Sequence, residues 1–475
     1  MSSISVPTQE KDLNPFIKIK ESLLNKRPEY LNIDHPEDLF SSEVNEYLSQ
    51  YPLTRHIDIC LHDLNGHVRG KQIDVQSLKK IYKGCYFPLS LYAMDLDGKV
   101  VEETGLGKSI GEPDMLCIPI SGTLQPCAIQ PETHAQLYLT MQDENGEGCK
   151  YEPRNLLSHI IAQLHQQDYY PVMSAELEFY LYKQNADGED EVLSSQCFDL
   201  NTPDDYQYVL EEVEQIARLQ SIEMIGIVAE AASGQYEINI QHTSNILRLC
   251  DQIMALKRII KQVARKHQLH ASFLAKPTLL KAGSGMHFHM SLCNASMQNL
   301  FSSNDLSTPS KMLLKTISGM IQLMPASMAI LAPNINSYRR FTLGHHVSLE
   351  ANWGINNRNV AIRIPCSDQE NQRLEYRVAG ADCNPYLAIA VILIATLHGL
   401  EHQLDTPQPV HLAKSKHEHI NLPKHQLEAL NLLKNNPVLK KYLGKEFIEV
   451  WCTVKSAEYY NVYNQITETE QNWDI

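Results

Sequence analysis

The sequence lacks the long apolar runs of membrane and secreted proteins. Residues 1–21 contain no apolar run long enough for a signal peptide, and no stretch of the 475 residues approaches the length of a membrane span. We therefore expect a cytoplasmic protein without a membrane-spanning segment. Apolar residues make up 43% of the chain and charged residues 20%, which is typical of a globular protein with a full core.

Several other common patterns are also missing. The eleven cysteines are an odd number without C-x-x-C spacing, which suits reduced thiols better than disulfides or a zinc ribbon. The net charge of −15 argues against a nucleic-acid surface and mildly favours a cationic partner. The segment Thr104–Ser109 has only part of a P-loop, because Glu102 stands where the first glycine is required. Any nucleotide must therefore be bound in another way.

What the sequence does contain is strands with unusual polar faces. The central one is KAGSGMHFHMS, residues 281–291, where two glycines allow a tight turn before an alternating strand. The alternation sends His287, His289 and Ser291 to one face and the apolar residues to the other. Neutral imidazole is a common metal ligand. Taken alone, however, a pair of solvated histidines explains this strand equally well.

Four other segments share this character, with glutamate or arginine in their polar places. They are Val172–Tyr182 with Glu176 and Glu178, Glu230–Ile240 with Glu230 and Glu237, Val360–Ile364 with Arg363, and Arg373–Val378 with Arg373, Glu375 and Arg377. Five carboxylates in one cavity repel each other unless cations compensate, and oxygen ligands with some imidazole suit Mg²⁺ or Mn²⁺. The arginines predict an anionic substrate. This combination fits phosphoryl transfer from ATP to a carboxylate.

Six spaced motifs identify the chain as similar to the glutamine synthetase superfamily over about residues 50–475. They are Glu176-Leu-Glu178-Phe, Glu230 with Gly234-Gln-Tyr-Glu237, Lys276-Pro with Gly283-Ser-Gly-Met-His287, Asn336-Ser-Tyr-Arg-Arg340, Asn357-Arg358 with Arg363-Ile-Pro, and Glu375-Tyr-Arg377. Within the superfamily the chain most resembles the gamma-glutamylputrescine synthetase branch, through motifs that include Asp63-Leu-Asn-Gly66 and Lys83-Gly-Cys-Tyr-Phe-Pro88. The resemblance implies that ATP phosphorylates the γ-carboxylate of L-glutamate and that an amine then displaces phosphate.

The resemblance also implies a role for individual residues. The first metal would be held by Glu178, Glu230 and Glu237, and the second, between the ATP phosphates, by Glu176, His287 and Glu375. Glutamate would be held by Gly283, Arg340 and Arg377, and the transferred phosphoryl group would face Arg358 and Arg377. The nucleotide would be surrounded by His289, Ser291, Arg363 and Arg373. For each arginine, a structural ion pair with a nearby glutamate is the alternative.

Three departures from ammonia-using glutamine synthetases surround the ammonium pocket. The chain has Ala282 in place of Asn, His346 in place of a Glu on the flap, and residues 93–98 in place of an Asp-Gly-Ser-Ser stretch. Because the metal ligands are kept, we expect an unchanged first half-reaction and a different nucleophile, most simply putrescine. His346 would be the catalytic base or a shield, although neighbouring His345 could equally point inward. The alternatives are an ordinary glutamine synthetase and a non-catalytic relative.

The expected fold is α+β. The resemblance implies an N-terminal extension at 1–50, a small beta-grasp domain at 51–145, and a catalytic domain of antiparallel strands backed by helices at 146–475. By the same analogy we expect a homo-oligomer, a dodecamer of two hexameric rings with shared active sites. Alternation around Asn65-Gly66 predicts a hairpin with a two-residue turn over 56–73, and helical spacing predicts helices including 153–167, 211–220, 246–268 and 385–402.

Overall fold

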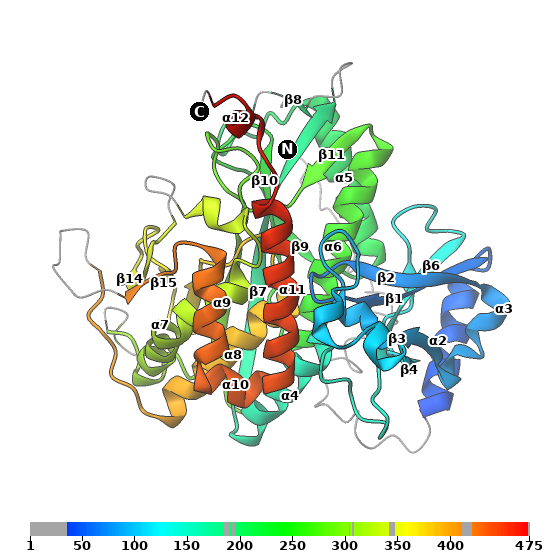
Figure 1. Ribbon diagram of the computed structural model, residues 1–475, viewed down its shortest axis with the longest axis horizontal. Coiled ribbons are helices and arrows are strands. Elements are labelled where there is room, and N and C mark those ends of the chain that lie inside the picture. Colours follow the sequence, from blue (N-terminus) through cyan, green and yellow to red (C-terminus); the bar gives the residue numbers. More distant parts are fainter. Residues whose placement is uncertain are drawn as a thin grey trace, which may run out of the picture.

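The computed structural model describes residues 36–473, except 185–189, 192, 194, 304, 306–307, 342–346 and 411–419. Its strands form a six-stranded sheet, a nine-stranded sheet and a small two-stranded one. Helices pack around both large sheets (Figure 1), and the predicted α+β class is confirmed. In this view the six-stranded sheet and helix α2 (Pro36–Gln50) lie at the right, and the helices of residues 426–463 lie near the centre.

The six-stranded sheet is built from the first part of the chain. Its strand order is β2-β1-β6-β4-β3, with β5 paired to β6. Strands β1 and β2 form the predicted antiparallel hairpin, whereas β1 and β6 run parallel. The elements are α2 (Pro36–Gln50), β1 (His56–His62), β2 (Val68–Asp74), α3 (Val75–Leu78), β3 (Cys85–Pro88), β4 (Asp114–Pro119), β5 (Gln125–Pro126) and β6 (His134–Met141), with short 3-10 turns between them.

The turn of the first hairpin differs from the two-residue turn predicted for it. The Gly66 N–H donates to the Asp63 carbonyl at 3.0 Å, and Gly66 is left-handed, with φ +76°. The loop is therefore three residues long and ends in a left-handed glycine. Tertiary contacts hold it in this form: Asn384 Nδ2 donates to two of its carbonyls, and the buried Lys455 ammonium donates to the Asn65 side chain. The hairpin thus docks against helices α8 (Pro385–Glu401) and α11 (Lys445–Tyr463).

The nine-stranded sheet has the order β14-β15-β16-β12-β7-β10-β9, and β8 and β11 also pair with β7. All its pairs are antiparallel except β14 with β15. The strands are β7 (Tyr170–Gln184), β8 (Asp190–Glu191), β9 (Met224–Ala229), β10 (Gln235–Ile240), β11 (Leu269–Ser272), β12 (Met286–Cys293), β14 (Trp353–Ile355), β15 (Ile362–Ile364) and β16 (Leu374–Tyr376), while β13 (Glu350–Ala351) pairs with β17 (Ile420–Asn421). Long β7 thus places its side chains in the middle of the sheet.

The chain also forms helices before, between and after these strands. They are α4 (Pro153–Gln166), α5 (Asp204–Leu219), α6 (Ile246–Lys266), α7 (Lys311–Leu331), α8 (Pro385–Glu401), α9 (Gln426–Asn435), α10 (Pro437–Leu443), α11 (Lys445–Tyr463) and α12 (Glu468–Gln471). Helix α5 begins earlier than predicted, because Tyr206, Val209 and Leu210 continue its buried side toward the N-terminus and two aspartates in the first turn favour a helix start. Helix α8 is buried almost throughout.

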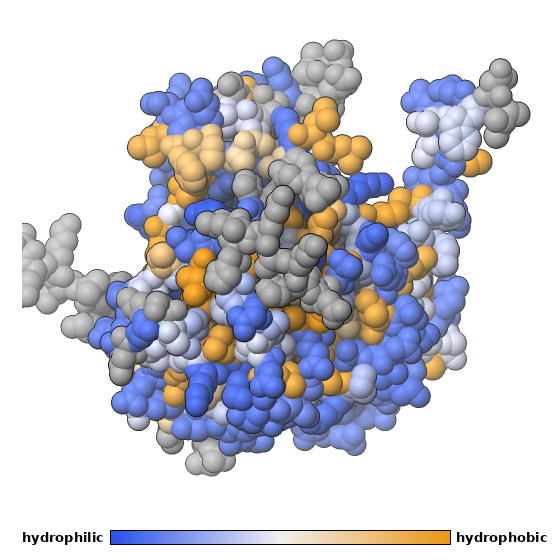
Figure 2. Space-filling model, turned by 90° about the vertical axis from the view of Figure 1, so that its left-hand side faces the viewer, coloured by the Kyte–Doolittle hydropathy of each residue, from blue (hydrophilic) through white to orange (hydrophobic). Residues whose placement is uncertain are grey.

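Helices α7 and α8 cross at two glycines. A Cβ on Gly319 would lie 2.0 Å from the Ala395 carbonyl oxygen, and one on Gly399 would lie 2.1 Å from that of Lys315. Any larger residue there would separate the helices. Among the described residues, α7 alone is long and apolar enough to cross a membrane, but 78% of its apolar window is buried inside the structure. On the face shown in Figure 2, apolar residues are interspersed among hydrophilic ones.

Glu152, at the start of α4, connects this helix to strand β6 of the six-stranded sheet. It is 4% exposed, and its Oε2 accepts hydrogen bonds from the Met141 N–H at 2.7 Å and the Thr140 hydroxyl at 3.2 Å. Burial raises the pKa of Glu152 to about 7, although these hydrogen bonds oppose the shift. The carboxyl is therefore held in a place that favours its neutral form.

We predict that this group makes folding pH-dependent. Because the pKa of Glu152 is raised from about 4.5 to about 7, its contribution to the free energy of unfolding is complete below pH 4.5. This contribution falls by about 3 kcal/mol as the pH rises through 7. Glu152→Gln keeps an acceptor for Met141 but cannot ionise, so its melting temperature should exceed that of the wild type at pH 8 and not at pH 5. The control is Glu132→Gln at an exposed position. The prediction would be contradicted if the difference in melting temperature between the Glu152 variant and the wild type were the same at both pH values.

Candidate active site

The polar side chains of three adjacent strands meet on one face of the nine-stranded sheet. In the register of β7 and β10, Glu178 lies opposite Glu237 and Glu176 opposite Asn239. On the other side of β7, Glu176 lies opposite His287 of β12. Residues directly opposite each other share a face of the sheet. The carboxylates and imidazoles predicted by alternation therefore do lie together.

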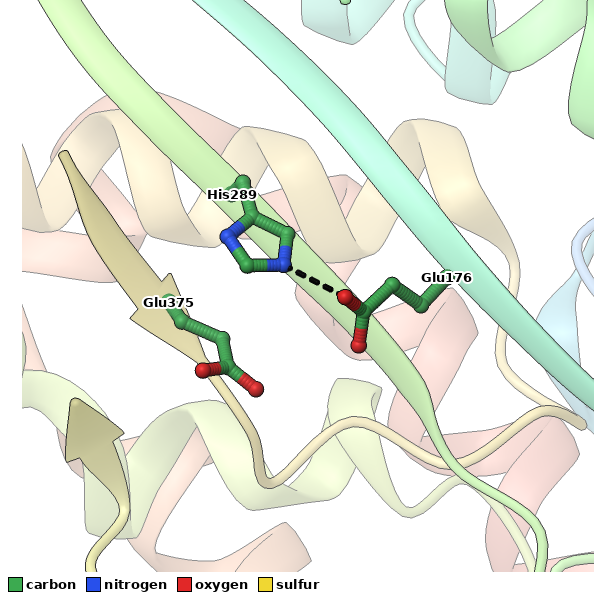
Figure 3. Close-up of side chains that lie close together, drawn as sticks. All are labelled: Glu176, His289 and Glu375. Atoms are coloured by element: carbon green, nitrogen blue, oxygen red, sulfur yellow. Dashed lines mark hydrogen bonds and ion pairs between the residues drawn. The ribbon is translucent and has the colours of Figure 1, made fainter. Parts of the chain in front are cut away.

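Two groups of side chains offer ligand atoms at distances that suit a metal ion. One consists of Glu176, Glu237 and His287, and the other of Glu176, His289 and Glu375; within each group the ligand atoms lie within 4.8 Å of one another. Figure 3 shows the second group, with His289 Nε2 lying 2.8 Å from Glu176 Oε1. His287 Nδ1 lies 3.1 Å from the other oxygen of Glu176. Glu176 thus belongs to both groups.

The remaining glutamates lie beside these groups. Glu178 Oε1 is 3.9 Å from His287 Nε2, and its Oε2 accepts the Gly285 N–H at 2.7 Å. Glu230 follows β9, and burial and the charge of Glu178 raise its pKa. His289 thus belongs to one of these groups, while Glu178 and Glu230 lie beside them. The periodicity of one strand gives no information about such cross-strand partners.

The cluster carries more negative charge than the protein around it neutralises. Burial, and then the charges of Glu176, Glu178 and Glu230, raise the pKa of Glu237 to about 9. Burial would also raise the pKa of Glu176, but hydrogen bonds from His287 and His289 bring it well below the ordinary range. Glu237 thus retains a proton, and Glu176 accepts hydrogen bonds from two imidazoles. Such a group of carboxylates suits a divalent cation of the Mg²⁺ or Mn²⁺ type.

Arginines surround Glu375 at the far side of the cluster. Arg363 Nη1 donates to one oxygen of Glu375 at 2.8 Å, and Arg377 Nη1 donates to the other. Burial would raise the pKa of Glu375, but neighbouring His287 and Arg377 bring it below its ordinary value. Arg363 and Arg377 thus form the ion pairs with a nearby glutamate that were the alternative to a role in substrate binding. Arg373 instead donates from Nε to His289 Nδ1 at 3.3 Å.

Arg340 fills the space behind the glycine-rich segment. It is 3% exposed, and its guanidinium donates to the carbonyls of residues 377–379. Its Nε has no hydrogen-bond partner among the residues that the structure describes. A Cβ on Gly283 would lie 2.7 Å from Arg340 Cγ, and one on Gly285 would lie 2.4 Å from Arg340 Nη2. A Cβ on Gly283 would also lie 2.6 Å from the Ala275 carbonyl oxygen, so this glycine is required by a backbone group as well as by Arg340.

Three of the predicted site residues take no part in these groups or lie outside the residues that the structure describes. Ser291 is half-buried and pairs with Val172 at the end of β12. Arg358 is exposed after β14. His346, like His345, lies outside the described residues.

Sequence reasoning assigned no role to Tyr180 and Gln235. The Tyr180 hydroxyl donates to the Ala282 carbonyl at 2.7 Å, and Gln235 Nε2 donates to the Gly283 carbonyl at 3.0 Å. Both follow the polar alternation of their strands, two residues from Glu178 and Glu237 respectively. That alternation is the signal that could have marked them.

Similar proteins are known for most of the chain. Residues 150–474 match the glutamine synthetase catalytic domain family. Gamma-glutamylputrescine synthetase PuuA of Escherichia coli (strain K12) is 46% identical over 446 residues, covering 91% of this chain and 94% of that protein. A glutamate–isopropylamine ligase of a Pseudomonas species is 30% identical over 429 residues, covering 87% and 92%. The solved structure of GmaS without ligand has a TM-score of 0.79 and 26% identity, covering 90% of this chain and 98% of its own. The chain belongs to the glutamine synthetase family.

Proposed function

We propose that the protein is an ATP-dependent ligase that joins the γ-carboxylate of L-glutamate to putrescine through a γ-glutamyl phosphate. The observation that carries this proposal is the carboxylate and imidazole cluster built on Glu176, Glu237, His287 and Glu375. Such a cluster serves phosphoryl transfer, and the chain is 46% identical to a gamma-glutamylputrescine synthetase over nearly its whole length. A non-catalytic relative would have no use for these buried charges, which are costly to keep.

Two divalent cations, Mg²⁺ or Mn²⁺, would complete the site. The first would be held by Glu178, Glu230 and Glu237, and the second by Glu176, His287 and Glu375, with His289 close to Glu176. Bound there, the cations would neutralise charge on the phosphates of ATP. Arg363 and Arg377 hold Glu375 in place from both sides. His289, Ser291, Arg363 and Arg373 would surround the nucleotide.

The arginines would orient the acid substrate. Arg340 and Arg377, with Gly283, would hold glutamate, and the buried Nε atoms of both arginines are donors without a hydrogen-bond partner among the described residues. Arg358 and Arg377 would face the phosphoryl group during its transfer. These residues bring the carboxylate and the phosphate together, which is the main requirement of phosphoryl transfer.

The choice of an amine as nucleophile rests on two polar groups that glutamine synthetases have and this chain lacks. Ala282 removes a polar side chain from the ammonium pocket of glutamine synthetases, and His346 replaces a carboxylate there. A neutral imidazole can accept a proton from an alkylammonium ion without trapping the smaller ammonium ion. We therefore propose an alkylamine nucleophile and leave ordinary glutamine synthesis as the second candidate.

We also propose a cytoplasmic homo-oligomer. Large apolar side chains are exposed near the C-terminus, including Tyr463, Ile466 and Trp473, at 67%, 72% and 58%. Such side chains in one segment suit burial against another subunit. A dodecamer of two hexameric rings is the assembly that the family analogy favours.

The first prediction concerns the nucleophile. ADP release in the presence of Mg²⁺ should require glutamate and putrescine together, and kcat/KM for ammonium should be at least about 100-fold lower, because the pocket lacks the carboxylate that holds ammonium. A coupled ADP assay with a panel of diamines and monoamines measures this. Equal kcat/KM for ammonium and putrescine would identify a glutamine synthetase instead.

The second prediction concerns Glu237. Glu237→Gln keeps the volume and strand pairing but removes one anionic ligand, so turnover should fall below about a tenth of the wild type and Mn²⁺ affinity should fall with it. The melting temperature without metal should stay within a few degrees of the wild type. Asn239→Ala, which removes the amide that donates to Glu237 at 2.9 Å, is the milder control. Retained turnover and metal affinity would give Glu237 a structural role.

The third prediction concerns His346. If His346 accepts the proton of the amine, His346→Ala should lower kcat by at least about 100-fold and flatten the acidic limb of the pH–rate profile. His345→Ala is the matched control. A variant with normal kcat and an unchanged acidic limb would show that His346 is not the base. Faster glutamate-dependent ATP hydrolysis without amine would assign it a shielding role.

A further inference from the structure

Three consecutive carbonyls beside the glycines are held by three buried side chains. Lys276 Nζ donates to the Lys281 carbonyl at 2.6 Å. The Tyr180 hydroxyl donates to the Ala282 carbonyl at 2.7 Å, and Gln235 Nε2 to the Gly283 carbonyl at 3.0 Å. The three donor residues are 2%, 0% and 1% exposed. Segment 281–283, which we call the glycine loop, is thus anchored at every peptide unit.

The glycine loop has few other means of holding its shape. It lies between β11 and β12 without regular secondary structure of its own. Just before it, Leu279 and Leu280 are 71% and 94% exposed, so the preceding residues give little support. A backbone segment containing glycine is conformationally free unless other groups fix it. The side-chain donors therefore replace the hydrogen bonds that a strand would supply.

The donors tie this segment to the strands that carry the carboxylates. Tyr180 lies on β7 two residues after Glu178, and Gln235 lies on β10 two residues before Glu237. The next two amides continue the pattern: the Ser284 N–H donates to the Ala275 carbonyl at 2.9 Å, and the Gly285 N–H to Glu178 at 2.7 Å. The trans peptide is planar, so fixing each carbonyl also fixes the direction of the following N–H. The loop and the cluster thus form one rigid unit.

From these contacts we infer that Tyr180 and Lys276 are positioning residues for the acid substrate. Both act through the glycine loop, whose Gly283 packs against Arg340 with no room for a side chain. A loop held at three carbonyls presents one surface beside Arg340, whereas a released loop would sample several. This inference rests on the proposed function, in which Gly283 and Arg340 hold glutamate. Gln235 also lies 3.4 Å from Glu178, so its substitution would disturb the cluster as well.

Tyr180→Phe tests the inference, because it removes one hydroxyl and little else. A buried carbonyl left without its donor should loosen the loop and raise KM for glutamate about tenfold, while KM for ATP changes less than twofold. The matched control is Tyr206→Phe. Tyr206 is equally buried, and its hydroxyl donates to the Leu181 carbonyl of β7 at 2.9 Å and accepts the Leu193 N–H at 3.0 Å, both outside the glycine loop. The control should leave both KM values unchanged.

Hydrogen exchange of the backbone amides of residues 282–285 gives a second measurement that does not depend on activity. Exchange should be faster in Tyr180→Phe and in Lys276→Met than in the wild type and in Tyr206→Phe. The inference is overturned if neither variant exchanges faster, or if KM for glutamate rises equally in the Tyr206 control. A wild-type protein that releases no ADP with glutamate and amines would instead refute the proposed function, and the exchange comparison would still test the anchoring of the loop.

Discussion

The repulsion between carboxylates on neighbouring strands is the constraint on which the rest of this structure depends. Strands β7 and β10 place Glu178 opposite Glu237, and β12 brings His287 against Glu176. Such charges cannot be buried together unless something compensates them. Two imidazoles lie against Glu176, two arginines lie against Glu375, and a raised pKa keeps a proton on Glu237. The residual charge is the reason for proposing cations.

The cluster is held rigid because the core on the other face of its sheet is apolar and close-packed. On the reverse face of β7 the side chains from Met173 to Leu181 are buried, α6 packs against this strand, and α8 lies in the core. Glycines are used where groups must approach closely, at the crossing of α7 and α8 and beside Arg340. Because the support cannot move cheaply, the ligand atoms stay near each other even though they repel. The same rigidity preorganises the site for a charged substrate.

Alternation and helical spacing predicted much of this from the sequence. The polar faces of β7, β10 and β12 follow directly from the alternation of their residues, and the buried α8 follows from a segment that is apolar on all sides. The partners across strands do not, because Glu176 and His287 are 111 residues apart and only the register decides that they meet. The pairing of His289 with Glu176 was missed for this reason. The hairpin turn at Asn65 was missed because its shape is set by Asn384 and Lys455, which are distant in sequence.

The central claim is that the cluster activates a carboxylate by transferring a phosphoryl group to it. Glutamate labelled with ¹⁸O in its γ-carboxylate tests this claim most directly, with mass spectrometry of the inorganic phosphate formed beside the amide. An acyl phosphate loses its carboxylate oxygen to the departing phosphate, so one ¹⁸O should appear in phosphate for every amide made. Phosphate without ¹⁸O, formed at the same rate as the amide, would contradict the account.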